Sequence, residues 1–278
     1  MRVEQLWTYP VKSMIGTTVE MVQLGPLGVI GDRYWAVRDL RRGGIRGAKK
    51  IGGLMRLAAR GTPRGSAEVV FPDGRTVGVE SPDIDAWISA ELGHPVRLEP
   101  LAPADDAEHY RRGAPDSEDM IDELRSIFGR EGDEPLPDLS VFPETIIEHE
   151  SPPGTYYDAF PLLVMTTAAL ASLQSALPES VVDVRRFRPS IVIDGAGDDG
   201  HPEFAWAGRK ARLGGAEIEF TVACPRCVMV TREIDESVPQ DRSVLRHVVR
   251  ELDQNVGVYA TVIQSGAVAV GDEVELSD

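Results

Sequence analysis

Both cysteines of the chain lie in the segment ACPRCVMVT, residues 223–231, where Pro225 and Arg226 separate Cys224 from Cys227. Two thiols at this spacing fit four kinds of site: a redox dithiol, half of a zinc site, one metal ligand with a bystander, or two small side chains packed in the core. Metals and electrophiles react with the thiolate, and a neighbouring cation favours that form. Because the proline makes a tight turn and the arginine brings a fixed charge beside Cys227, the segment indicates chemistry more than packing.

The zinc and dithiol interpretations gain little from the rest of the sequence. Zinc needs four tetrahedral ligands, and no two histidines have the spacing of a zinc site. The histidines are scattered: His94, His109, His149, His201 and His247. A thioredoxin-like dithiol opens a helix in a βαβ unit, whereas we expect a strand over Val228–Glu233. A lone soft thiolate beside anion-binding cations suits a metal that arrives with its own organic ligand.

Lys12 and Ser13 offer an ammonium, a hydroxyl and turn amides directly after a predicted strand, in YPVKSMIG (9–16). This combination binds phosphate, although a solvated lysine in a turn has the same sequence. Farther along, Arg33 follows a Gly-Asp turn at the start of another predicted strand. Asp32 either orients Arg33 or forms a surface ion pair that contributes little.

Three arginines precede a predicted buried strand in VRRFRPSIVIDG, residues 184–195. They are Arg185, Arg186 and Arg188. Pro189 is expected to keep Arg188 extended, and Ser190 adds a hydroxyl. Charges at a strand end also protect the edge from pairing with another chain, so this cluster alone does not define a site.

The overall charge makes the positions of the cations informative. The 278 residues carry a formal net charge of −16, with a pI near 4.8, which argues against binding to nucleic acid or to anionic membranes. Four cations nevertheless lie at loop–strand junctions, where binding sites concentrate: Lys12, Arg33, Arg188 and Arg226. Together they could neutralise an anionic cofactor, with each charge-assisted hydrogen bond contributing about 1.5–3 kcal/mol.

The location of the protein follows from two absences in the sequence. No apolar run approaches the ~18 residues of a membrane helix, and the N-terminus resembles a strand, not a signal peptide. We therefore expect a cytoplasmic protein without membrane contact. Two cysteines exclude a disulfide scaffold, and a reducing compartment keeps both thiols free.

Short strands separated by turn signals fill the first hundred residues, with one helix over 85–92. The predicted strands there are Val3–Thr8, Thr18–Val22, Tyr34–Arg38, Glu68–Phe71, Thr76–Val79 and Val96–Glu99. Residues 102–144 differ, because they contain 13 acids, several prolines and one short helical pattern near Met120–Phe128. Such a segment is typical of a linker, a lid or a surface excursion.

Strands predominate again in the last third of the chain. They are predicted over Ser190–Ile193, Glu217–Val222, Val228–Glu233, Val258–Gln264 and Glu273–Leu276. Helices are predicted over Ala168–Leu177, capped by Thr166 or Thr167, and over Ser243–Gln254. No βαβ alternation occurs, which argues against a Rossmann or TIM architecture. We expect an α+β, mostly β protein with a barrel-like module in 1–101, an acidic, proline-rich connection in 102–144 and a second β-barrel domain in 145–278 with a few peripheral helices.

Five segments in this order resemble the MOSC-domain proteins, named for the C-terminal domain of molybdenum-cofactor sulfurase. These segments are YPVKS, GDRYWAVRD, RRFRPSIVIDG, CPRCVMVT and NVGVYATVIQSGAVAVGDEVEL. The resemblance runs nearly end to end and extends to bacterial relatives of the amidoxime-reducing molybdoenzymes. It implies an N-terminal MOSC β-barrel module, a MOSC domain and a molybdopterin-type cofactor held between them.

The resemblance also assigns residues. Cys227 corresponds to the family's molybdenum-ligating cysteine, which makes it the expected catalytic and metal-binding residue. The cofactor-binding positions fall on Lys12, Ser13, Arg33, Thr166, Thr167, Arg188, Ser190 and Arg226. Ser190 stands where the family has Asn, and Pro225 stands where relatives can have Ser. Cys224 is expected to pack. Pyridoxal phosphate, which serves a separate domain of the sulfurases, is not expected, since this chain has no room for that domain.

Two functions are compatible with these residues. The resemblance implies a molybdenum-dependent oxidoreductase that reduces a small N-hydroxylated substrate. Its electrons would come from a separate flavin or haem protein, because no Gly-rich dinucleotide fingerprint occurs. The alternative is a sulfur carrier, sulfurtransferase or C–S bond enzyme that uses Cys227 as a persulfide or nucleophile without a metal.

Overall fold

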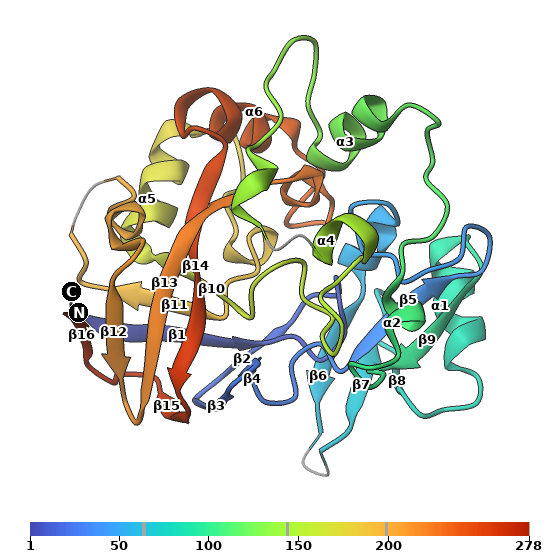
Figure 1. Ribbon diagram of the computed structural model, residues 1–278, viewed down its shortest axis with the longest axis horizontal. Coiled ribbons are helices and arrows are strands. Elements are labelled where there is room, and N and C mark those ends of the chain that lie inside the picture. Colours follow the sequence, from blue (N-terminus) through green and yellow to red (C-terminus); the bar gives the residue numbers. More distant parts are fainter. Residues whose placement is uncertain (63–64, 143–144, 198–199, 278) are drawn as a thin grey trace.

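The structure, a computed structural model, describes residues 1–62, 65–142, 145–197 and 200–277. Residues 143–144, which end the predicted connection, lie outside this description. Strands predominate and the helices lie at the periphery (Figure 1), which confirms the mostly β, α+β class. The strands are β1 (Arg2–Thr8), β2 (Thr17–Val19), β3 (Met21–Gly25), β4 (Gly28–Val29), β5 (Trp35–Asp39), β6 (Ala58–Gly61), β7 (Ala67–Val70), β8 (Thr76–Gly78), β9 (Val96–Pro100), β10 (Leu162–Thr166), β11 (Ile191–Asp194), β12 (Lys210–Leu213), β13 (Ala216–Pro225), β14 (Asn255–Gln264), β15 (Gly266–Ala269) and β16 (Val274–Ser277). The α-helices are α1 (Ile84–Leu92), α2 (Ala107–Tyr110), α3 (Met120–Phe128), α4 (Thr145–Glu148), α5 (Thr167–Ala176) and α6 (Arg242–Glu251).

The first strand of the chain belongs to the sheet of the C-terminal half. The large sheet has the strand order β16-β12-β13-β14-β10-β11-β1-β2. Within it, β1 pairs antiparallel with β11, and β10 pairs parallel with β11. The small sheet β15-β3-β4 likewise joins the two ends of the chain. The strands β1 to β4 therefore lie in space with the strands that follow position 160.

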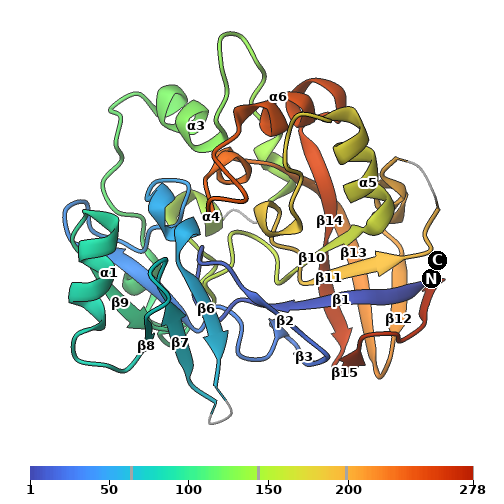
Figure 2. The same cartoon turned by 180° about the vertical axis from the view of Figure 1, so that it is seen from behind.

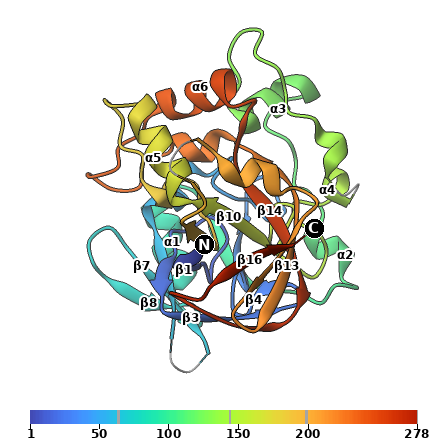
Figure 3. The same cartoon turned by 90° about the vertical axis from the view of Figure 1, so that its left-hand side faces the viewer.

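Contacts between the two chain ends curl the large sheet toward a barrel. The amide of Val3 donates to the carbonyl of Asp272 over 2.9 Å, and the amide of Val274 donates to the carbonyl of Met1 over 2.9 Å. Figure 3 looks onto this side of the molecule, where β16 lies close to β1, and Arg2 forms an isolated bridge with Glu273. Closure of this kind removes the free edges that an open sheet would expose.

A second body, the N-terminal body, contains the strands from β5 to β9 and the helix α1 (Figure 2, blue to teal). It is built from the antiparallel pair β5–β9 and the sheet β6-β7-β8. The Pro-Asp-Gly turn at 72–74 joins β7 to β8 in a hairpin. Gly93 ends α1 with a φ of 60°, a conformation that glycine adopts without strain.

Local signals set the predicted helices where the structure has them. The Asp119 side chain accepts from the amides of Ile121 and Asp122 at the start of α3. Thr166 caps α5, and Asp241 caps α6 by accepting from Ser243. Each carboxylate or hydroxyl satisfies an amide that the first helical turn leaves without a partner.

Two strand predictions are wrong. Val228–Thr231 forms a 3₁₀ helix, η5, not the start of a strand, because Met229 and Val230 bury their side chains against different cores. The predicted strand Thr18–Val22 is split into β2 and β3, which pair with different partners.

The acidic connection crosses from the N-terminal body to α6 along one side of the molecule (Figure 1, green). It contains α2 and α3, and Arg130 within it is only 6% exposed. The segment is thus packed against both halves, at least over 102–142.

The buried apolar side chains gather into separate clusters, and two of them meet at η5, directly after Cys227. One cluster fills the N-terminal body and includes Met229, and half-buried Cys227 packs against it. A second fills the barrel, and a third lies between α5, α6 and η5. Among the helices of the described residues, none is both long and apolar enough for a membrane span.

Candidate functional site

A pocket lies where the two bodies meet, and it opens to solvent. Five segments that are distant in sequence line it, together with Tyr259 of β14: the turns after β1 and β4, residues 156–163, the stretch 186–188 and the segment 224–229. Among the described residues, five cationic side chains and one acid line this pocket. The cations are Lys12, Arg33, Arg186, Arg188 and Arg226, and the acid is Asp158. In a chain with a net charge of −16, this local excess of positive charge favours an anionic ligand.

The two cysteines have different surroundings. Cys224 is 2% exposed, and burial raises the pKa of its thiol. Cys227 is half-buried and begins η5, where β13 has ended and the chain turns. The buried thiol is held in its neutral form, so Cys227 is the better placed of the two to bind a metal or react.

Arg226 points to Cys224, contrary to the expectation that it would pair with Cys227. Its Nη1 donates to the sulfur of Cys224 over 3.0 Å, and its Nη2 donates to the carbonyl of Phe187 over 2.8 Å. Its Nε is buried with no hydrogen-bond partner among the described residues. The guanidinium therefore keeps one donor for a ligand in the pocket.

Lys12 is buried and bound to a carboxylate. Its Nζ donates to Asp158 over 2.7 Å, to the carbonyl of Tyr156 over 2.8 Å and to Ser151 over 3.2 Å. Lys49 contacts the other oxygen of Asp158 at 3.1 Å. Burial alone would raise the pKa of Asp158, but the two ammonium groups outweigh it and hold this pKa well below its ordinary value. Asp158 thus ties the segment before β10 to the lysines.

Ser13 organises the turn beside Lys12. Its hydroxyl oxygen accepts from the amide of Ala48 over 2.9 Å. A Cβ on Gly47 would lie 2.6 Å from this oxygen, so glycine is needed for the two turns to meet. The contact lies next to Lys49, which follows Ala48 and reaches Asp158 at the pocket.

Arg33 lies between two tyrosine rings and a buried carboxylate. Its guanidinium carbon is 5.2 Å from the centre of Tyr9 and 4.9 Å from that of Tyr157, within range of cation–π attraction. Its Nη1 is 3.2 Å from Asp32, which also accepts from the amide of Tyr9 over 2.7 Å. Burial raises the pKa of Asp32 to about 6 despite the adjacent guanidinium. Asp32 therefore orients Arg33 from within the protein and is not part of a surface ion pair.

Arg188 also lies over the ring of Tyr9. Its guanidinium carbon is 4.3 Å from the centre of Tyr9, and its Nη1 donates to the carbonyl of Met14. Burial lowers the pKa of Arg188 to about 10. The expectation of an extended backbone before Pro189 is wrong, since the φ of Arg188 is 59°. That left-handed turn directs the side chain toward β1.

Left-handed backbone is concentrated around the site. Among the described residues, the non-glycine positions with positive φ are Ser13, Arg33, Arg188, Asp253 and Gln254. The first three line the pocket, and Gln254 accepts a hydrogen bond from the amide of Arg226 over 2.8 Å. Such conformations cost energy and persist where the surroundings impose them, which is common at functional sites.

The other predicted positions do not line the pocket. The hydroxyl of Thr166 donates to Glu203 over 2.7 Å, and that of Thr167 donates to Asp194 over 2.7 Å. Ser190 is fully buried, and its hydroxyl has no partner among the described residues. Thr166 and Thr167 lie at the junction of β10 and α5, and Ser190 directly precedes β11, so these three residues belong to the framework around the pocket and do not line it.

Sequence reasoning did not single out several residues of the site. Tyr259 lines the pocket and is hydrogen-bonded to Cys224, and burial raises the pKa of its phenol well above the ordinary value. Phe160 packs beside Tyr259 with ring centres 5.1 Å apart. Asp158 and Lys49 were also missed. A signal was present for Tyr259, because it lies within the family-like tail 255–276, but apolar neighbours gave it the pattern of a core residue.

Comparisons with known proteins agree with this architecture. Residues 1–110 match the MOSC N-terminal beta barrel domain, and residues 152–275 match the MOSC domain. Since these matches cover most of the sequence, the chain belongs to the MOSC-domain proteins. The boundary of the first match lies within the predicted connection.

Curated relatives extend over nearly the whole chain. The human mitochondrial amidoxime reducing component 2 is 25% identical over 98% of this chain and 82% of its own length. The human mitochondrial amidoxime-reducing component 1 is 26% identical over 99% of this chain and 82% of its own length. A solved structure of the YuaD protein from Bacillus subtilis covers 99% of this chain and 94% of its own, with 11% identity and a TM-score of 0.46.

Proposed function

We propose that the pocket binds an anionic, pterin-type molybdenum cofactor and that Cys227 supplies the sulfur ligand to the metal. One observation carries the proposal: a half-buried thiol lies in a pocket whose described lining has five cations and one acid, contributed by both bodies. The free Nε of Arg226 supports the fit, because a buried donor without a partner is costly unless a ligand accepts from it. The donor set, one soft sulfur among cations, suits an anionic metal complex.

The residues of this chain would then have separate roles in binding the cofactor. Lys12, Arg33, Arg188 and Arg226 neutralise the charge of the cofactor, and Ser13 orders the turn that carries Lys12. The ring of Tyr9 lies within range of cation–π attraction for both Arg33 and Arg188, and this attraction offsets part of their mutual repulsion. Thr166, Thr167 and Ser190 act indirectly, through the elements that they support.

The activity that we propose is the reduction of a small N-hydroxylated substrate. When bound, the cofactor would supply two-electron oxygen-atom-transfer chemistry. The overall reaction would consume two electrons and two protons and give water and the deoxygenated product. The electrons would come from a separate flavin or haem protein in the cytoplasm. Membership in the MOSC family and the names of the amidoxime-reducing relatives support this reaction.

Metal analysis tests the proposal. Protein purified from a host that makes the cofactor should contain about one molybdenum per chain, and Cys227→Ala should reduce this to background. Cys224→Ala is the matched control and should retain most of the metal, because its sulfur faces Arg226. Benzamidoxime reduction with an artificial electron donor should follow the metal content. Metal-free wild type with a persulfide on Cys227 would instead establish the sulfur-carrier alternative.

A further inference from the structure

A buried arginine of the acidic connection reaches the segment that carries Cys227. Arg130 lies just after α3, and it is 6% exposed. Its Nη1 and Nη2 each donate to the carbonyl of Arg226 over 3.3 Å. Its Nη2 also donates to the side-chain oxygen of Gln254 over 2.8 Å. One planar guanidinium thus joins two segments that are more than 90 residues away in sequence.

These contacts hold the peptide groups that precede Cys227. The amide of Arg226 donates to the carbonyl of Gln254 over 2.8 Å, while the carbonyl of Arg226 accepts from Arg130. Gln254 itself has a left-handed backbone with a φ of 70°. Both polar groups of the Arg226 backbone are therefore hydrogen-bonded. The guanidinium of Arg130 also binds the side chain of Gln254, so the three residues form one connected set of hydrogen bonds. A rigid backbone at Arg226 fixes the direction of the next side chain, Cys227.

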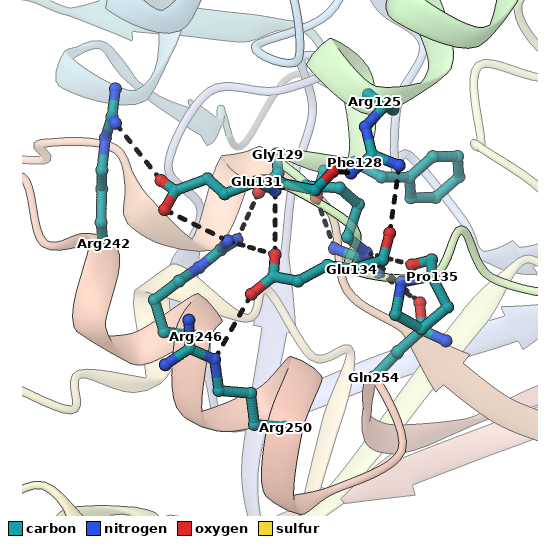
Figure 4. Close-up of polar contacts among 12 residues, drawn as sticks. Arg125, Phe128, Gly129, Glu131, Glu134, Pro135, Arg242, Arg246, Arg250 and Gln254 are labelled. Atoms are coloured by element: carbon teal, nitrogen blue, oxygen red, sulfur yellow. Dashed lines mark hydrogen bonds and ion pairs between the residues drawn. The ribbon is translucent and has the colours of Figure 1, made fainter.

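The connection is in turn fixed on α6, as Figure 4 shows. Glu134 forms ion pairs with Arg246 and, at 3.4 Å, with Arg250. Glu131 contacts Arg242 at 3.4 Å. Together with Arg130, these contacts bind residues 130–135 to the helix that precedes Gln254, so Arg130 is held from both sides.

Close packing around Gly129 restricts the backbone at the start of residues 130–135. Gly129 has a φ of 62°, and a Cβ there would lie 2.8 Å from Leu245 and 3.1 Å from Val228. The chain thus enters the segment in direct contact with both α6 and η5. This close approach aims Arg130 at the back of the Cys227 segment.

We propose that Arg130 is a positioning residue for Cys227, which makes the acidic connection a structural part of the site. The ligand role of Cys227 rests on the function proposed above, but the positioning itself is a property of the protein without cofactor. The lysine side chain has one point charge in place of a planar fork. Arg130→Lys should therefore keep one of the two contacts and preserve the effect in part.

Hydrogen exchange in the metal-free protein tests the positioning role, with Arg125→Met as the matched control. Arg125 lies in the same connection, and its guanidinium donates to the carbonyls of Gly132 and Glu134 without reaching Arg226. In Arg130→Met, we expect exchange in peptides covering 223–231 to rise at least tenfold, with β10 unchanged. Arg125→Met should leave 223–231 as in wild type. No change in Arg130→Met, or equal increases in both variants, would overturn the proposal.

Two further measurements complete the test. If Arg130→Met does not fold, Arg130→Lys replaces it, and we expect exchange in peptides covering 223–231 to rise about threefold. Unchanged exchange in Arg130→Lys would contradict the positioning role. Molybdenum retained after gel filtration should fall more in the Arg130 variant than in Arg125→Met. A wild type that binds no molybdenum would refute the proposed function, whereas the exchange result would still decide the role of Arg130.

Discussion

The guanidinium of Arg226 donates to the sulfur of Cys224 over 3.0 Å, although Cys227 is its neighbour in the chain. The arrangement arises because β13 ends at Pro225 and the backbone turns before η5. Cys224 thus helps to hold a cation of the pocket, while the thiol of Cys227 lies at the boundary between the two bodies. The contributions of the two cysteines to protein stability and to metal binding can therefore be measured in separate experiments.

Replacing Cys224 should reduce the stability of the protein more than replacing Cys227 does, which is the reverse of the order expected for metal binding. Cys224→Ala removes the acceptor of a buried guanidinium and leaves a small cavity, so we expect a loss of about 1–3 kcal/mol. Cys227→Ala, at a half-buried position, should cost less than about 1 kcal/mol. Urea unfolding of the metal-free variants measures both values. Equal losses would contradict distinct roles for the two thiols.

The link between Asp158 and the two lysines should appear in the pH dependence of stability. The folded-state pKa of Asp158 is depressed, so its contribution is present above the unfolded value of about 4 and is lost as the pH falls. The Asp158 side chain is 38% exposed, and solvent screening limits the expected loss in Asp158→Asn to about 1–2 kcal/mol at pH 7. In denaturant titrations, the difference in stability between wild type and variant should shrink as the pH falls below about 4. A constant difference across this range would show that the charge is not involved.

Asp32 should behave in the opposite way. Its folded-state pKa is raised from 3.8 to about 6, so the folded protein binds the extra proton and loses stability as the pH rises through that interval. The shift corresponds to roughly 3 kcal/mol. Relative to Asp32→Asn, which has no such proton, wild type should become less stable between pH 4 and pH 7. Parallel stability curves for the two proteins would contradict the buried carboxylate.

Strain at Arg188 can be measured by comparing two truncations. Both Arg188→Ala and Arg188→Gly remove the guanidinium, but only glycine adopts a φ of 59° without strain. We expect the glycine variant to be more stable by about 1 kcal/mol. At Arg186, in a right-handed 3₁₀ turn, the same pair should show the reverse order. If alanine is the more stable residue at both positions, the backbone at Arg188 is not strained.

The elements that could be predicted from the sequence have the residues that start and end them within a few positions of the element itself. Helix α3 was predicted at the bounds it has, because Asp119 caps its first turn and Gly129 ends its last. The 3₁₀ helix at Val228–Thr231 was predicted as a strand, since a β-branched apolar run has the same local pattern in both. Which of the two forms depends on the cores that Met229 and Val230 enter.

The sequence by itself determined the inventory of the site: a thiol beside an arginine, and a few cations at strand ends in an otherwise acidic chain. Those are properties of residue type and local spacing. Tertiary structure alone decided which thiol Arg226 contacts, that Asp158 joins Lys12 to Lys49, and that Arg130 reaches the carbonyl before Cys227. The contacts of Asp158 and Arg130 join segments that are distant in the sequence, and the contact of Arg226 depends on the turn between β13 and η5. Tertiary packing, and not local residue preference, brings these groups together.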